Sequence, residues 1–111
     1  MEGPVKGEVV VIAFPFSDLS QMKRRPALVL AEASPQDLIL CEITTRRSPD
    51  PFAVPLLDSD FVAGALRHDS FIRPTRLFTA HRRLIITTAG RLKPAKLDQV
   101  IESLIALLQS G

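Results

Sequence analysis

Short apolar runs, separated by polar turns and loops, divide the chain into several extended segments. Residues 8–14 are β-branched and nearly continuous in apolarity, which is typical of a strand buried on both faces. Residues 27–33 and 38–44 predict two further strands. The polar segment between them, residues 34–37, has proline at the second position of a β-turn. This short connection predicts an antiparallel hairpin.

The segments after this hairpin have weaker β signals, because each is short and is interrupted or followed by proline or glycine. Residues 52–57 are expected to be extended, with Pro55 at a sheet edge, and residues 58–66 to contain a helical turn. Residues 70–73 and 76–79 predict two strands bent at Pro74, and residues 84–88 predict a strand that Gly90 ends. Two polar loops are expected at residues 17–23 and 45–51.

The last segment predicts an amphipathic helix that begins at Pro94, because proline is favoured at the first helical position. Apolar residues recur there at helical spacing, with polar residues between them. They are Leu97, Val100, Ile101, Leu104 and Leu108, widened by Ile105 and Leu107. Packing on the core is the simpler interpretation of this stripe, and contact of part of it with another subunit is the alternative.

The order of these elements, several short antiparallel strands and then one helix, predicts a mainly β protein with helices (α+β). A small, strongly bent, barrel-like antiparallel sheet with a C-terminal α-helix fits this order. Because 111 residues is the length of one domain, we expect residues 1–111 to form a single unit.

Composition narrows the class of protein. Hydrophobic residues make up 46% and charged residues 23% of the chain, as in ordinary globular proteins. No apolar run reaches the ~18 residues of a membrane span, and the first residues lack the layout of a signal peptide. We therefore expect no membrane association and a cytoplasmic location. The single cysteine, Cys41, lies in an apolar run, where an inert thiol is the better interpretation than a nucleophile.

Arginine dominates the cations, although the formal net charge is only +2. Ten of the 14 cations are arginine, and six of those ten form adjacent pairs at Arg24-Arg25, Arg46-Arg47 and Arg82-Arg83. Arginine is favoured in phosphate contacts, but a biased genome composition would give the same pattern. The chain has no Trp and no Tyr, so a broad aromatic platform for single-stranded nucleic acid is not expected.

The basic segment Lys23-Arg24-Arg25 runs into Pro26 just before the second predicted strand. Proline is tolerated at the first residue of a strand, because that residue need not donate a ladder hydrogen bond. It also favours extended backbone at the residue before it. We therefore expect the Arg25 guanidinium at the rim of the sheet, where its planar fork can hold a phosphate. A solvated charge cluster is the simpler alternative.

The predicted hairpin brings Arg25 to the same end of the sheet as Thr44 and Thr45, because similar numbers of residues lie on either side of the turn. A guanidinium and a hydroxyl at that point can grip a phosphodiester and stabilise charge on its oxygens. Neither group is an obvious base near neutral pH, since arginine stays protonated. The residues by themselves leave a phosphate-binding site and a catalytic site both open.

Other chemistry has no support in the sequence. His68 and His81 are far apart and lack partners at metal-ligand spacing, so structural or solvent-facing roles are expected for both. The five glycines are scattered, and the chain has neither a phosphate-binding glycine loop nor a nucleophile elbow. We expect no metal and no cofactor.

Several motifs, in order along nearly the whole chain, resemble the MazF/PemK family of toxin endoribonucleases. The most specific are Lys6-Gly7-Glu8-Val9-Val10, Phe14-Pro15-Phe16 and Lys23-Arg24-Arg25-Pro26-Ala27-Leu28-Val29. Weaker matches are Ile43-Thr44-Thr45, Pro51-Phe52, Asp69-Ser70 and Gly90-Arg91-Leu92. The resemblance implies a small SH3-like β-barrel with helices that forms a homodimer.

The resemblance also implies an activity, which is metal-independent cleavage of single-stranded RNA (mRNA) at short motifs. The products are a 2′,3′-cyclic phosphate and a 5′-hydroxyl. It places catalysis on Arg25 and Thr44, with Thr45 as a neighbouring candidate for the site hydroxyl. The implied substrate-binding residues are Lys23, Arg24, Thr45, Arg46, Arg47 and Phe16.

The partners that the resemblance implies are RNA and a cognate antitoxin that covers the same surface, with DNA bound only through the antitoxin. Two alternatives stay open. One is a non-catalytic toxin directed at DNA gyrase, as in the related CcdB family. The other is an inactive family member that only binds an antitoxin.

Overall fold

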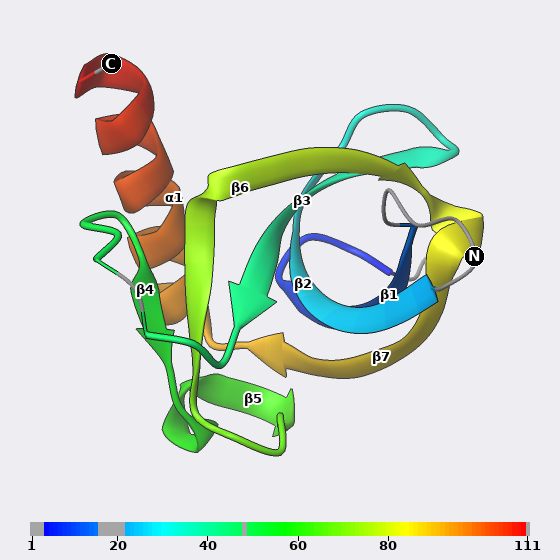
Figure 1. Cartoon of the computed structure of the whole chain (residues 1–111), viewed down its shortest axis with the longest axis horizontal. Helices are drawn as coiled ribbons and strands as arrows, with labels where there is room; N and C mark the ends of the chain where they lie inside the picture. Colours follow the sequence, from blue (N-terminus) through cyan, green and yellow to red (C-terminus); the bar gives the residue numbers. More distant parts are fainter. Residues whose placement is uncertain (1–3, 16–21, 48, 111) are drawn as a thin grey trace.

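The structure of the protein, a computed structural model, describes residues 4–15, 22–47 and 49–110. A curled sheet of seven strands forms most of it, in the order β4-β6-β3-β2-β1-β7-β5 with antiparallel neighbours, and one helix follows (Figure 1). The strands are β1 (Glu8–Pro15), β2 (Met22–Glu32), β3 (Asp37–Thr44), β4 (Val54–Leu56), β5 (Phe61–Gly64), β6 (Ser70–His81) and β7 (Ile85–Leu92). The helix is α1 (Pro94–Ser110), and two single 3-10 turns lie at Asp58–Asp60 and Arg82–Leu84. The predicted small, bent antiparallel barrel with a C-terminal helix is confirmed.

The hairpin of β2 and β3 forms as the sequence predicts. Leu28 lies opposite Cys41 and Glu32 opposite Leu38, and residues 33–36 connect the strands. The Ser34 hydroxyl accepts hydrogen bonds from the backbone N–H groups of Gln36 and Asp37, which stabilises the turn.

β2 begins earlier than predicted, and the basic segment lies inside the strand instead of in a loop before it. Met22 pairs with Pro15 and Arg25 with Ile12, so β1 extends the ladder past Pro26. The pairing of β2 with β3 starts only at Ala27. Pro26 therefore has a free strand edge on its β3 side, and its missing N–H disrupts no ladder there.

β6 and β7 are both longer than predicted. β6 is one strand with a corner, because Cys41 pairs with Leu77 while the next residue, Glu42, pairs with Arg73. Residues 74–76 are the excess on β6, which confirms the predicted bend at Pro74. Figure 1 shows β6 turning this corner beside its label.

The prediction that Gly90 ends the last strand is wrong. Gly90 lies within β7 and pairs with Val9 of β1 and Gly64 of β5. A Cβ at position 90 would lie 2.5 Å from the Ala63 carbonyl oxygen and 2.8 Å from a ring carbon of Phe61. Glycine here allows the close approach of β5, so it keeps the strand in place instead of breaking it.

In the segment between β4 and β6, the expected helical turn at residues 58–66 is the 3-10 turn Asp58–Asp60, and β5 follows it directly. β4 is the first strand in the sheet order, which confirms that Pro55 lies at an edge.

Two hydrophobic clusters form the core, because successive residues of the central strands point to opposite faces of the curled sheet. The first cluster includes Leu28, Cys41, Ile43 and Ile72, together with Val100 of α1. The second cluster consists of Val10, Ile12, Ala27, Val29, Leu38 and Leu40, with Phe78, Ala80, Leu84 and Ile85 packed against it. Cys41 is fully buried, and burial raises the pKa of its thiol to about 12, as fits the expected inert role.

α1 begins at Pro94, as predicted. Val100, Leu97 and Leu104 pack on the first cluster, and the Ser103 hydroxyl donates a hydrogen bond to the Phe52 carbonyl oxygen (2.6 Å). Leu108 remains 69% exposed, so the core-packing interpretation holds only for the first part of the apolar stripe. Contact of the rest with another subunit stays a prediction. No helix within the described ranges is long and apolar enough to cross a membrane.

Candidate functional site

One face of the β2–β3 hairpin changes from apolar to charged along its length. Ala27 and Val29 of β2 belong to the second core cluster, and Arg25 is the next residue on that face. On β3, Leu40 belongs to the same cluster and Glu42 follows on the same face. The same strands that bury the core therefore carry polar side chains to one end of the sheet.

An open basin of about 800 Å³ lies at this end. Residues of β2, β3, β6 and the loop after β3 line it: Arg25, Pro26, Glu42, Ile43, Thr44, Thr45, Arg46, Arg47, Arg73 and Arg76. The lining thus includes five arginines and one carboxylate. Such an excess of guanidinium groups suits a phosphate-bearing ligand.

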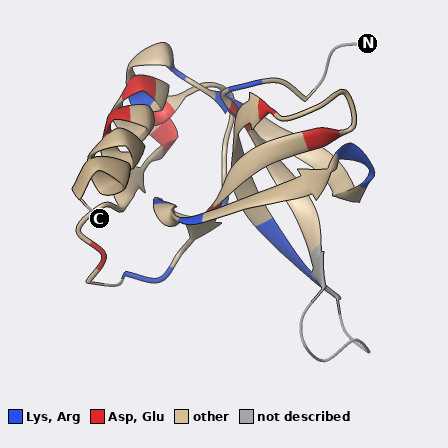
Figure 2. Ribbon diagram, turned by 90° about the horizontal axis from the view of Figure 1, so that it is seen from above, with Lys and Arg blue, Asp and Glu red and all other residues tan. Residues whose placement is uncertain are grey.

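Arg25 lies in the basin beside Glu42, and Nη1 of the arginine donates to Oε2 of the glutamate at 3.2 Å. The Arg25 side chain is 36% exposed and the Glu42 side chain 19%. Because part of the Arg25 side chain remains exposed, a phosphate that enters the basin can compete with Glu42 for its guanidinium. In Figure 2 the basic residues of β2 form a blue stretch of strand.

Thr44 and Thr45 both line the basin, as the hairpin geometry predicts. The Thr44 hydroxyl oxygen, at the end of β3, accepts a hydrogen bond from the backbone N–H of Arg46 (3.1 Å). Since a hydroxyl both accepts and donates, its hydrogen can still be given to a phosphate oxygen. The same contact turns the chain at the strand end and directs the next residues along the basin.

Asp50 anchors the far end of this arginine-bearing loop. Its Oδ2 accepts hydrogen bonds from the Thr75 hydroxyl (2.7 Å) and from Nε of Arg73 (3.2 Å), and Oδ1 accepts from the backbone N–H of Phe52 (2.9 Å). Burial by itself would raise the pKa of Asp50, but the three hydrogen bonds and the charge of Arg73 outweigh it and hold the pKa below its usual range. The loop is therefore tied to β6 at the corner of that strand.

The remaining predicted substrate-binding residues lie in different places. Lys23 and Arg24 are exposed on β2 and are not part of the basin lining, and strand alternation directs Arg24 to the face opposite Arg25. Arg46 and Arg47 line the basin, with Cζ of Arg47 at 6.0 Å from the centroid of the Phe71 ring. Phe16 lies outside the described residues.

Three basin residues were missed in the sequence. Glu42 interrupts the apolar strand on the face that carries the core residue Leu40, and this break in the apolar pattern was the available signal. Arg73 and Arg76 flank Pro74, and only the corner of β6 brings both to the hairpin end. Pairing over such a sequence distance cannot be read from local pattern.

The histidines lie away from the basin. His68 is exposed, and Nδ1 of His81 accepts a hydrogen bond from the backbone N–H of Arg83 (3.0 Å). In the part of the chain that the structure describes, no three His, Cys, Asp or Glu side chains form a cluster able to hold a metal ion.

The fold and the basin define a small curled β-sheet protein with an arginine-rich site at one end of its central hairpin. Residues 5–108 match the profile of a family described as the PemK-like, MazF-like toxin of type II toxin–antitoxin systems. The chain belongs to this family of toxins.

Solved structures share the fold at low sequence identity. A MazF from Deinococcus radiodurans, in a MazE–MazF complex, has a TM-score of 0.78 at 23% identity, with 97% of this chain and 98% of that chain covered. An endoribonuclease from a mycobacterial species, in complex with its cognate antitoxin, has a TM-score of 0.77 at 17% identity, with 98% of both chains covered. The toxin MazF-mt6 of Mycobacterium tuberculosis has a TM-score of 0.73 at 16% identity, with 92% and 96% covered. No curated protein sequence matches the chain significantly.

Proposed function

We propose that this toxin is a metal-independent endoribonuclease that cleaves single-stranded RNA, such as mRNA, at short motifs. The observation that carries the proposal is the presence of Arg25 and Thr44 in one open basin with four further arginines. Family membership supports the same activity, because solved relatives are described as endoribonucleases. No comparable observation favours the gyrase-directed or inactive alternatives.

In the proposed reaction, the ribose 2′-hydroxyl attacks the adjacent phosphorus, and the 5′-oxygen of the next nucleotide leaves. Arg25 offsets the charge that develops on the phosphoryl oxygens, and Thr44 donates a hydrogen bond to one of them. Arg46 and Arg47 follow the RNA backbone on either side. The products are a 2′,3′-cyclic phosphate and a 5′-hydroxyl, and DNA is not a substrate because it lacks the nucleophile.

A cognate antitoxin is the second proposed partner. Relatives of the same fold have been solved as MazE–MazF complexes and as an endoribonuclease with its antitoxin. An acidic segment of such an antitoxin would be complementary to the arginines of the basin and would block RNA access. In the same proposal, the toxin forms a homodimer and acts on mRNA in the cytoplasm. It contacts DNA only through the antitoxin.

The test is incubation of the purified protein with an RNA oligonucleotide in EDTA, beside a copy that carries deoxyribose at the scissile position. We expect cleavage of the RNA in the chelator, a cyclic phosphate end, and an uncut deoxy copy. Cleavage of both oligonucleotides, or loss of cleavage in EDTA, would contradict the proposed mechanism.

A further inference from the structure

The proposed reaction needs a group that accepts the proton of the attacking 2′-hydroxyl. Arg25 stays protonated and Thr44 is a poor base, so neither can serve near neutral pH. Among the described residues that line the basin, Glu42 alone carries a carboxylate. We propose that Glu42 is the proton acceptor for the 2′-hydroxyl, an inference that rests on the proposed function.

The position of Glu42 suits this role. It lies two residues before Thr44 on β3, so both side chains point to the same face of the sheet. Its Oε2 atom is 3.2 Å from Nη1 of Arg25. The carboxylate, the guanidinium and the hydroxyl therefore all line the same basin.

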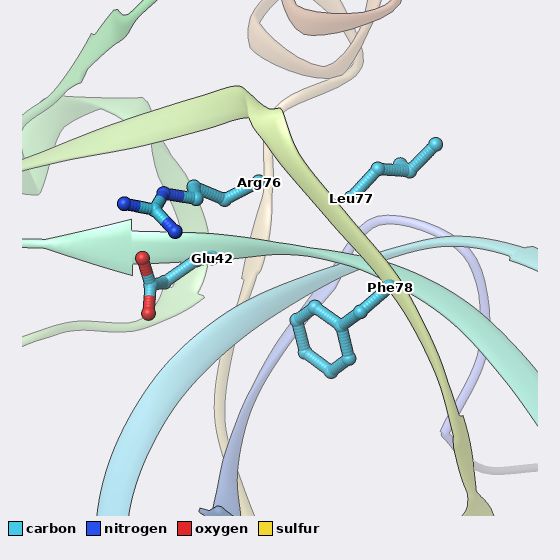
Figure 3. Close-up of a pocket in the computed structure, with 4 residues that line it drawn as sticks. All are labelled: Glu42, Arg76, Leu77 and Phe78. Carbon is cyan, nitrogen blue, oxygen red and sulfur yellow. The ribbon is translucent and has the colours of Figure 1, made fainter. Parts of the chain in front are cut away.

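Glu42 also lies where two hollows meet. It lines the large basin together with Arg25 and Thr44, and it lines a smaller hollow of about 210 Å³ with Arg76, Leu77 and Phe78. Figure 3 shows the head groups of Glu42 and Arg76 near each other, with the Phe78 ring to their lower right. The Phe78 ring gives the smaller hollow an aromatic wall, which suits a nucleoside, whereas the basin suits its phosphate.

This arrangement matches the chemistry of RNA. The 2′-hydroxyl of a nucleotide lies between its own base and its 3′-phosphate. A nucleoside seated at the smaller hollow, with its 3′-phosphate in the basin, would present the 2′-hydroxyl at the border that Glu42 occupies. Arg76 lies on the same border and can contact either the ribose or the phosphate.

The other charged residues that line the basin with Glu42 are all cationic. They are Arg25 on β2, Arg73 and Arg76 on β6, and Arg46 and Arg47 in the loop after β3. When a phosphate takes over the Arg25 guanidinium, a carboxylate oxygen becomes available to the 2′-hydroxyl.

The step balances without an oxidant or metal. The 2′-oxygen forms a bond to phosphorus as its proton passes to Glu42 Oε2, and the bond from phosphorus to the 5′-oxygen breaks. The departing 5′-oxygen takes a proton from a water molecule of the open basin. Glu42 then returns its proton to the solvent hydroxide, which restores the carboxylate.

The test compares wild type, Glu42→Gln and Glu42→Asp for single-turnover cleavage of an RNA oligonucleotide between pH 3 and 8. Gln keeps the size and can still accept a hydrogen bond from Arg25, but it cannot take the proton. Glu32→Gln is the matched control, because Glu32 also pairs with an arginine, Arg82, at the opposite end of the hairpin. Thermal unfolding and binding of the 2′-deoxy oligonucleotide verify that each variant folds and binds.

We expect Glu42→Gln to slow cleavage by ~10²–10⁴-fold, the usual contribution of a general base, with little change in binding. The wild-type rate falls in acid as the carboxylate is protonated, and this acid limb disappears in Glu42→Gln. Glu42→Asp restores part of the rate, and Glu32→Gln cleaves like wild type.

Two results would overturn the assignment. Cleavage by Glu42→Gln at the wild-type rate would remove Glu42 from the reaction. An equal loss at every pH, with the acid limb kept, would make Glu42 a positioning residue for Arg25. Failure of the wild type itself to cut RNA would instead refute the proposed function, so the two failures are distinguishable.

Discussion

At the scale of single residues, Arg25 differs from its neighbours in the basic segment because of the direction of its side chain. Arg24 and Arg25 are adjacent cations, yet only Arg25 lines the basin, since successive residues of a strand alternate between faces. The sequence marks the whole segment as basic, and strand geometry distinguishes its members.

We predict that Arg25→Ala lowers kcat/KM for RNA cleavage by ~10²–10³-fold, as the removal of one transition-state charge stabiliser typically does. Arg24→Ala, which removes the same charge from the other face, should change it by less than ~10-fold. A fluorogenic RNA oligonucleotide measures both rates. Equal losses in the two variants would mean that general charge, and not position, matters.

At the scale of elements, Asp50 ties the loop after β3 to the corner of β6. Two of the three hydrogen bonds to its carboxylate, from Arg73 and Thr75, connect residues that are far apart in the sequence. Because the pKa of Asp50 is lower in the folded chain than its usual value, its contribution to stability is complete above that usual value. The contribution is lost as the pH falls through the lower, folded value.

We therefore predict that Asp50→Asn lowers the free energy of unfolding at pH 7 and that the difference from wild type shrinks in acid. Urea denaturation at pH 7 and near pH 3 measures this. Asp69→Asn, a change at an exposed carboxylate, is the control and should leave the pH dependence unchanged. A difference between wild type and Asp50→Asn that stays constant with pH would contradict the assigned role.

The contact of β5 with β7 depends on the missing side chain of Gly90. A Cβ there meets backbone of β5, which cannot rotate away as a flexible side chain can. We predict that Gly90→Ala destabilises the fold by ~1–3 kcal/mol, the usual cost of overpacking. Chemical denaturation measures the change, with Thr87→Ala, an exposed position on the same strand, as the control. If Gly90→Ala loses no more stability than the Thr87→Ala control, β5 can move aside to make room for the added methyl group.

At the scale of the whole molecule, the formal net charge of +2 hides a strong local asymmetry, because five arginines gather at one basin. Phosphate binding by such a basin releases counterions and weakens with salt. We predict that the association constant of a non-cleavable RNA analogue depends less steeply on salt when Arg46 and Arg47 are both changed to alanine. The negative slope of its logarithm against log salt should become smaller in magnitude by ~1.4, because each cation on a single strand contributes ~0.7.

Arg67→Ala, at an exposed position outside the basin lining, should leave this slope unchanged. Fluorescence anisotropy over a range of salt concentrations measures each slope. A double variant with the wild-type slope would place the RNA away from the loop after β3.

Much of this organisation was accessible from local pattern. The apolar runs predicted β1, β3 and the hairpin turn, and Pro94 predicted the first residue of α1, because these signals involve neighbours within a few residues. The start of β2 and the role of Gly90 were missed, since each depends on which strand lies alongside. Arg73 and Arg76 were missed for the same reason.

The sequence by itself determined the small mainly β architecture with its terminal helix, the toxin family, and the hairpin that brings Arg25 to the level of Thr44. These follow from residue periodicity, turn chemistry and motifs, which are local properties. Only the tertiary structure decided that Arg73 and Arg76 join them. The corner of β6 and the pairing of β3 with β6 bring Arg73 opposite Glu42, although the two residues are more than 30 positions apart in the chain. Sheet pairing over such distances is a property of the folded molecule.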